Sequence, residues 1–278
     1  MTKRNTDRLL TLVLIPIAAL FFIPLILVIL NSFKSKFTIL SAPFALPNAD
    51  TFVGIANYIK GITASGFFGA AGRSLWITVG SVLLIVLGTS MTAWYITRVR
   101  TPFCRVIYGL FVFSMIVPFQ MVMYSMVFTA DRLRLNNPLG ILVLYLGFGA
   151  GLSVFMFSGF IRSIPKELEE AATIDGCQPL QLFFSIIFPV LRPIAVTIAV
   201  LNAMWIWNDY LLPYLVLGTD KYKTLPVTIQ ITMQGAYGAV DWGGFMAMLV
   251  LAIIPIVIFY LSCQKYIIKG VIAGAVKG

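Results

Sequence analysis

The chain has 278 residues, of which 60% are hydrophobic and 11% are charged, and its formal net charge is +10. Soluble domains carry about 25% charged residues and a single core stops growing near this length, so this composition excludes an ordinary soluble fold and predicts that lipid surrounds most of the chain. The basic residues occur in short clusters between apolar segments, which favours helix-flanking positions over a nucleic-acid-binding face.

The first apolar segment, Leu9–Leu30, is long enough to cross a bilayer as a helix. A signal peptide would have an apolar region of about 7–15 residues, followed by a cleavage site of small residues. Asn31-Ser32-Phe33-Lys34 follows instead, which favours a retained helix within residues 1–33. Residues 34–74 are more polar and contain several prolines and glycines, so we expect an extracytoplasmic loop there.

Five further apolar segments have the length of a membrane-spanning helix. They are Leu75–Ile96, Val106–Ala130, Leu139–Ile161, Ile194–Leu217 and Phe245–Ile267. They are too long for barrel strands and lack alternation between apolar and polar residues. The sequence therefore predicts an all-α integral membrane protein with six transmembrane helices. Its single domain would consist of the N-terminal helix, the loop, core helices at 75–267 and a tail at 268–278.

The orientation follows from the basic residues. Six spans place both termini on the same side, and basic residues are more numerous on that side. The short loop from Arg98 to Arg105 also contains three basic residues and no acid. The positive-inside rule then places both termini in the cytoplasm.

Several kinds of chemistry are excluded by absent residues and motifs. There is no histidine, and Cys104, Cys177 and Cys263 are far apart and form no CxxC pair. His-ligated metal sites, Ser-His-Asp triads and a disulfide framework are therefore not expected. The sequence also lacks Gly-Lys-Ser/Thr and GxSxG motifs, so we expect no catalysis, no metal site and no P-loop of its own.

The most polar cytoplasmic stretch is residues 163–178, between the fourth and fifth apolar segments. Pro165 and the glutamates after it suit the N-terminus of a short helix, and Gly176 allows a left-handed stop. Two alanines would let another surface approach the backbone closely. Four residues fall on one face of this predicted helix: Leu168, Ala171, Ala172 and Asp175.

This stretch resembles the integral subunits of ATP-binding-cassette (ABC) importers. Their pattern is Glu-Ala-Ala, three residues, Gly, nine residues and Ile-x-Leu-Pro. It matches Glu170-Ala171-Ala172, Gly176, Ile186 and Pro189, with Phe188 where Leu is usual. Residues 163–176, the run Trp205–Pro213 and the ending 269–278 are similar to the carbohydrate importers, specifically to the shorter, tail-bearing permease of the maltose-transporter-like branch.

The resemblance implies a type I ABC importer permease fold in a bacterial inner or plasma membrane, with residues 163–178 as the coupling helix. The implied partners are a second permease, two ATPase subunits that bind ATP and Mg, an extracellular sugar-binding protein and a carbohydrate, in keeping with a di- or oligosaccharide. No cofactor is implied for this chain, and no nucleic acid. The ATPase contacts would be Leu168, Glu170, Ala171, Ala172, Asp175 and Gly176, together with the tail residues Ala273, Gly274, Ala275, Val276, Lys277 and Gly278. Gln234, Gly235 and Tyr237 would contact the binding protein.

Asp209 is the only acid inside an apolar segment, and three interpretations of it remain open. It could line the sugar pathway with Asn202, Trp205 and Asn208, pair with an arginine of a partner helix, or lie in an aromatic belt at the outer interface. The alternative function is a secondary transporter or channel of six helices. Such a protein would be expected to place several ionisable groups within its spans.

Overall fold

The computed structural model describes the backbone of residues 3–234 and 240–275, and the side chains of residues 10–233 and 240–264. Helices form almost all of the regular structure in this part of the chain. An isolated antiparallel bridge joins Lys34 to Phe52. The chain divides into two compact units, Met1–Gly69 with Thr228–Pro255 and Ala70–Val227 with Ile256–Gly278, and each is described by itself.

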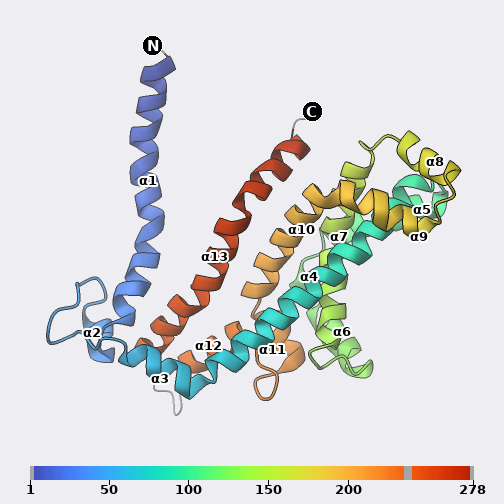
Figure 1. Cartoon of the computed structure of the whole chain (residues 1–278). Helices are drawn as coiled ribbons and strands as arrows, with labels where there is room; N and C mark the ends of the chain where they lie inside the picture. The colour runs from blue at the N-terminus through green and yellow to red at the C-terminus, as the bar shows by residue number, and fades with distance from the viewer. Residues whose placement is uncertain (1–2, 235–239, 276–278) are drawn as a thin grey trace. The chain divides into compact units, whose positions relative to one another are not determined.

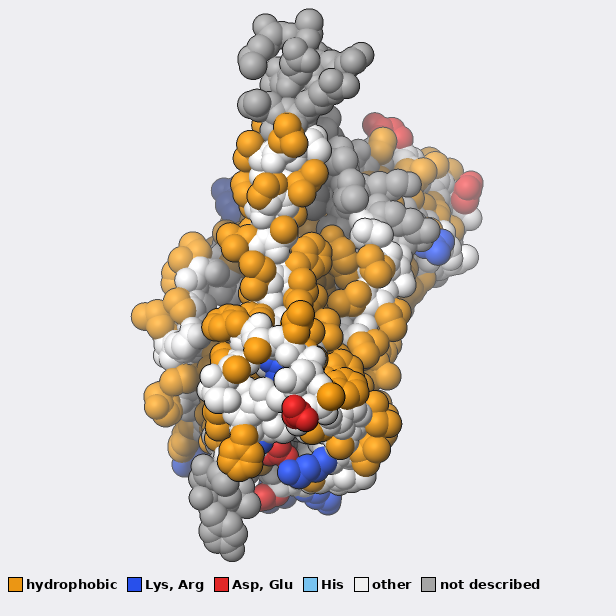
Figure 2. Space-filling model, turned by 90° about the vertical axis from the view of Figure 1, so that its left-hand side faces the viewer, with side chains coloured by type: hydrophobic (Ala, Val, Ile, Leu, Met, Phe, Trp, Pro, Cys, Tyr) orange, Lys and Arg blue, Asp and Glu red, His pale blue; other side chains and the backbone are white. Residues whose placement is uncertain are grey.

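The first unit begins with α1 (Lys3–Ser32), and apolar side chains cover the described part of this helix (Figure 2). Two short helices follow, α2 (Lys36–Ser41) and α3 (Ala56–Ser65). Lys34 is fully buried, and its Nζ donates hydrogen bonds to the carbonyl oxygens of Ala42 (3.2 Å) and Pro43 (3.3 Å). This burial lowers the pKa of Lys34. The buried ammonium group of Lys34 therefore joins the segment just before α2 to the backbone that follows α2.

An ion pair in the same unit joins α3 to the start of α13 (Trp242–Ala275): Lys60 Nζ lies 2.8 Å from Asp241 Oδ2. Burial alone would raise the pKa of Asp241, but the hydrogen bonds from Lys60 and from the Gly244 backbone outweigh it and lower that pKa. On α3, Asn57 Nδ2 also donates to the carbonyl oxygens of Ser32 and Lys34. These bonds fix the short helices to the end of α1.

The second unit contains most of the remaining helices (Figure 1). They are α4 (Phe67–Arg98, whose first turn belongs to the first unit), α5 (Pro102–Ser114), α6 (Phe119–Arg132), α7 (Gly140–Ile161), α8 (Glu167–Ile174), α9 (Pro179–Leu182), the π-helix η1 (Phe183–Ile187), α10 (Phe188–Asn208) and α11 (Leu211–Leu217). α12 (Leu225–Gln234) and α13 extend over both units. Within the second unit, α8, α9 and the start of α5 gather at one end, and α6 and α11 lie at the other (Figure 1).

The core of the second unit forms around α7, which packs against both α5 and α10. Its largest fully buried side chains include Tyr145, Phe157 and Ile198. Glycines permit the close approach: a Cβ at Gly149 would lie 2.6 Å from Ile85 Cδ1, and one at Gly151 would lie 2.6 Å from Ser114 Oγ. Small residues are a common device for bringing membrane helices together.

The predicted membrane spans are largely confirmed. Among the described residues, five unbroken helical stretches are long and apolar enough to cross a bilayer: Leu10–Ser32, Phe67–Arg98, Gly140–Ile161, Pro179–Asn208 and Trp242–Gln264. A sixth crossing exists if α5 and α6 together form one span. A helix needs about 20 apolar residues to cross the hydrocarbon core.

Three predicted boundaries need correction. Val106–Ala130 is not one straight helix, because α5 and α6 meet at 109° around Pro118, which lacks an N–H and disfavours helix in the residue before it. Ile194–Leu217 is interrupted at Asp209, where the backbone becomes extended. The expected loop 34–74 contains α2 and α3, and α4 already begins at Phe67, after the left-handed Gly66 ends α3.

Candidate functional site

The short helix α8 lies between α7 and α9 and has two distinct faces. Ala172 is 5% exposed and belongs to the core of the unit. The opposite face carries Glu170, Ala171 and Ile174, all exposed, and Ile174 is 85% exposed. Of the two predicted alanines, only Ala171 is therefore available to another protein, while Ala172 lets α8 approach its own unit.

Glu169 joins α8 to the C-terminal end of α4. Its Oε1 lies 2.7 Å from Arg98 Nε and 2.6 Å from Arg98 Nη2, and its Oε2 accepts a hydrogen bond of 3.1 Å from Trp94 Nε1. Arg98 also donates to the carbonyl oxygen of Ile164, in the turn that precedes α8. Both charged side chains are only 14% exposed. With two arginine nitrogens on one carboxylate oxygen and Trp94 on the other, the orientation of Glu169 is fixed from both sides.

The connection from α8 onward follows the prediction closely. Gly176 has φ +83°, so it is in the left-handed conformation that favours glycine. Pro179 then begins a continuous helical stretch that runs to Asn208. Pro165 lies just before α8 instead of in its first turn, because the helix begins at Glu167. Four residues, 175–178, thus separate α8 from a helical stretch long enough to span the membrane.

The predicted sugar-pathway residues fall into two groups. Asn202 is buried, and its Nδ2 donates to Ser153 Oγ (3.3 Å) and to the carbonyl oxygen of Ile198 (2.9 Å). Asp209 accepts a hydrogen bond from the Tyr145 hydroxyl (2.9 Å), and its other oxygen accepts one from the backbone N–H of Leu211, the first residue of α11 (3.0 Å). These two side chains are occupied by contacts within the chain.

Trp205 and Asn208 are exposed instead. Trp205 is 42% exposed and meets the Tyr145 ring edge-on, with ring centroids 5.5 Å apart. Asn208 is exposed, and its Nδ2 donates to the carbonyl oxygen of Met204 on its own helix. A ring face and an amide beside each other are groups that bind sugars well, because the ring packs on the sugar face and the amide pairs with hydroxyls.

Some predicted contact residues lie outside the described part of the chain. Gly235 and Tyr237 are outside it, and Gln234 is described only as the last residue of α12. In the tail, α13 continues to Ala275, so the backbone of Ala273, Gly274 and Ala275 is helical, and Val276, Lys277 and Gly278 are outside the described residues.

Sequence reasoning missed the residues that hold α8 in place. Glu169 lies next to the predicted Glu170, but its partners Arg98 and Trp94 are more than 70 positions away. Ile174 was also missed, although its spacing from Glu170 and Ala171, at i+4 and i+3, places it on their face. No group of three or more His, Cys, Asp or Glu side chains able to hold a metal occurs among the described residues.

Comparisons with known proteins agree on one family. The family described as "Binding-protein-dependent transport system inner membrane component" matches residues 85–273. The probable starch degradation products transport system permease protein AmyC of Thermoanaerobacterium thermosulfurigenes is 38% identical over 97% of this chain and 96% of its own length. The multiple sugar-binding transport system permease protein MsmG of Streptococcus mutans is also 38% identical, over 93% and 92%.

A solved structure supports the same fold. One chain of a bacterial ABC transporter that imports the acidic polysaccharide alginate aligns with a TM-score of 0.77, covering 96% of this chain and 98% of its own length at 23% identity. The arrangement of helices described above is therefore that of an ABC importer permease.

Proposed function

This chain belongs to the binding-protein-dependent transport system inner membrane component family, and from that premise we propose that it is one permease subunit of an ABC importer for a di- or oligosaccharide. A binding protein outside the cell delivers the sugar, and a separate ATPase drives alternating access. The names of the relatives, which refer to starch degradation products and to multiple sugars, support the substrate class.

The exposed face of α8 is the observation that carries the proposal. Glu170, Ala171 and Ile174 present one carboxylate, one small side chain and one apolar side chain to the surroundings of the chain. An isoleucine that is 85% exposed, on a helix outside the membrane spans, is what a protein partner would cover. The partner we assign to this face is the ATPase, with Asp175, Gly176 and Leu168 flanking the contact.

The same proposal assigns the other contacts. Trp205 and Asn208 face a cavity shared with a second permease subunit, and their exposure in the isolated chain supports this. The loop with Gln234, Gly235 and Tyr237 meets the binding protein, and the tail reaches the ATPase. Both termini are in the cytoplasm, in keeping with the basic loop between α4 and α5. The subunit itself performs no covalent chemistry, so ATP and Mg bind to its partner.

The test is sugar uptake and ATPase co-purification by the transporter assembled with its partner subunits. Glu170→Lys, Gly176→Pro and Ile174→Asp should leave the chain in the membrane but abolish uptake and weaken co-purification of the ATPase. Ile55→Asp is the matched control, because Ile55 is 65% exposed and lies before α3 in the other unit.

Wild-type uptake in all three α8 variants would refute the assignment of this face. Uptake that continues in the absence of any ATPase would instead favour the alternative, a secondary transporter or channel.

A further inference from the structure

We propose that the end of the second unit beside α8 holds a binding site for the phosphate group of an anionic phospholipid. The proposal rests on the proposed function in one respect, the placement of this end at the cytoplasmic face of the membrane. It concerns a cavity that neither the ATPase contact nor the sugar pathway uses.

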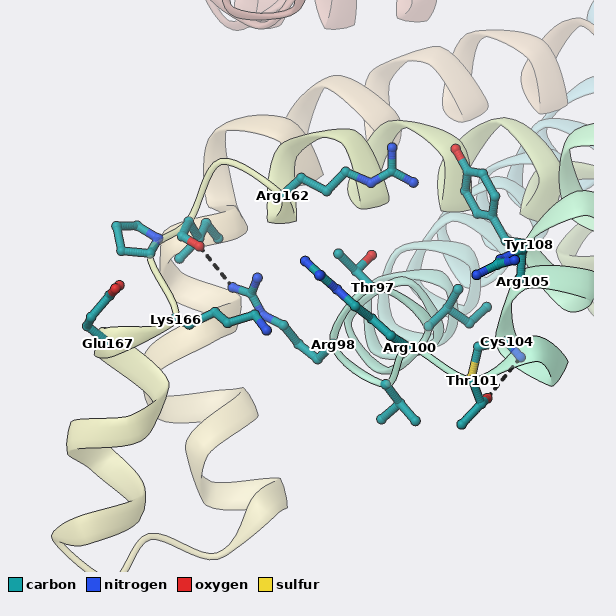
Figure 3. A pocket seen from close by; sticks show the side chains of 14 residues that line it. Thr97, Arg98, Arg100, Thr101, Cys104, Arg105, Tyr108, Arg162, Lys166 and Glu167 are labelled. Atoms are coloured by element: carbon teal, nitrogen blue, oxygen red, sulfur yellow. Dashed lines mark hydrogen bonds between the residues drawn. The ribbon is translucent and has the colours of Figure 1, made fainter.

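The cavity has a volume of about 590 Å³ and lies where three helices end or begin. The end of α4 and the loop after it, the first two turns of α5, and the turn between α7 and α8 form its walls (Figure 3). The size is sufficient for a small ligand or the head group of a lipid.

Basic side chains dominate the lining. Arg98, Arg100, Arg105, Arg162 and Lys166 all line the cavity, against one acid, Glu167. Arg98 is already paired with Glu169. The other four form no ion pair with any side chain in the described part of the chain. In Figure 3, Arg162 extends toward Tyr108 and Arg105, while Arg100 extends toward Arg98. The Arg162 guanidinium lies 5.4 Å from the centroid of the Tyr108 ring.

The four uncompensated cations favour an anion, and the three guanidinium groups among them favour phosphate. Guanidinium groups bind phosphate oxygens through two parallel hydrogen bonds, and several of them can share one phosphate. The N-terminal end of α5 faces the cavity as well, and its dipole adds partial positive charge. A neutral or cationic ligand would leave these charges unpaired.

The outer surface of α5 indicates a lipid as the source of the phosphate. Phe103, Val106 and Leu110 are 70%, 61% and 57% exposed and follow each other at helical spacing on the same first turns whose other side lines the cavity. This apolar surface is turned away from the cavity and would be covered by lipid, which places lipid head groups close to the helix end that lines the cavity. Basic pockets beside cytoplasmic helix ends are suited to anionic lipid head groups. A free phosphate ion, by contrast, would interact only with the cations of the cavity and would not require a neighbouring apolar surface.

The experiment measures lipid retention by the purified full-length chain. The chain is mixed with equal amounts of dioleoyl phosphatidylglycerol and dioleoyl phosphatidylcholine in detergent, and bound lipids are counted by native mass spectrometry. The double variant Arg100→Gln/Arg105→Gln should retain phosphatidylglycerol about 30-fold more weakly, from a factor of about five for each cation. Arg100→Lys/Arg105→Lys keeps the charge and should retain most of the binding. The matched control is Arg132→Gln/Arg192→Gln, which removes two exposed arginines outside the cavity and should behave as the unmodified chain.

Equal retention by the glutamine double variant and the control would overturn the proposal. Complete displacement of phosphatidylglycerol by millimolar inorganic phosphate would overturn the lipid assignment in favour of a free phosphate site. Loss of the lipid when the ATPase is added would show that the cavity belongs to the ATPase interface, which also overturns it. Because none of these measurements requires transport, failure here is distinguishable from failure of the proposed function.

Discussion

Two adjacent carboxylates on α8, Glu169 and Glu170, have opposite surroundings. Glu170 is exposed, whereas Glu169 is held by Arg98 and Trp94 of α4. A charge that is this buried depends on its partner, because removing one member leaves the other without compensation. The pair therefore decides whether α8 keeps its position relative to the membrane helices.

We predict that Glu169→Gln lowers the thermal midpoint of the purified chain, corresponding to a loss of about 1–3 kcal/mol of stability. The reason is that Arg98, 14% exposed, then lacks its countercharge. Differential scanning fluorimetry in detergent measures the change, and Asp220→Asn, at an exposed acid of the same unit, is the control. Identical midpoints for the two variants would contradict the prediction.

The polar residues near the end of α10 also have opposite surroundings, because Asp209 is bonded within the chain whereas Asn208 is exposed. Tyr145→Phe should lower stability, because it removes the hydroxyl that donates to Asp209 in a largely buried setting. Asp209→Asn should lower it less, because the amide keeps one accepting oxygen but replaces the other with a donor. Asn208→Ala should leave stability unchanged and instead alter the rate of uptake or the preference among several sugars. Uptake assays and melting curves on the same preparations separate these effects. If Asn208→Ala transports every sugar normally, the sugar is held by the other permease.

At the scale of elements, apolar length predicted where helices exist but not where they bend. The six apolar segments, the short helix before Pro179 and the left-handed Gly176 could all be predicted, because each depends on local sequence. The break at Asp209 was missed although Pro213, in the first turn of α11, indicates it, and the hydrogen bond from Tyr145, 64 positions away, could not be predicted. Pro118 was visible in the sequence, but hydropathy averages over such a residue and gave one span across it. The role of Glu169 could not be predicted either, because its partners Trp94 and Arg98 are distant in the sequence.

The bent pair α5–α6 gives a prediction at this scale. If the pair forms one crossing, the loop at Arg100–Thr101 and the loop at Leu133–Pro138 lie on opposite sides of the membrane. Single cysteines placed in each loop of a cysteine-free background should then react with a membrane-impermeant maleimide from opposite sides in intact cells and inverted vesicles. Labelling of both loops from the same side would mean that the pair is re-entrant and that the chain crosses five times.

At the scale of the whole molecule, the tail links the last membrane helix to the proposed ATPase. The backbone of α13 remains helical to Ala275, so the described part of the tail continues the last membrane helix. Glycines in this tail would suggest a flexible extension, whereas the backbone is helical to Ala275. The alanines of the tail favour a helix.

Deletion of residues 269–278 should therefore reduce sugar uptake while the ATPase still assembles and hydrolyses ATP. Deletion of 276–278 alone leaves the described helix intact and is the matched comparison. The measurement is the ratio of sugar transported to ATP hydrolysed in reconstituted vesicles. An unchanged ratio after the longer deletion would mean that the tail has no role in coupling.

The π-helix Phe183–Ile187 makes the position of α8 depend on the exact length of the chain between α8 and α10. Its wider turn is marked by a hydrogen bond from the Phe188 N–H to the Phe183 carbonyl oxygen. Phe188 alone separates it from Pro189, which has no N–H to continue an α-helical ladder. Deleting one residue here would restore ordinary winding and rotate everything before it by about 100° around the axis of α10. Glu169 would then point away from Arg98. We therefore expect function to depend more on the length of this segment than on its composition, so that single substitutions are tolerated better than single insertions or deletions.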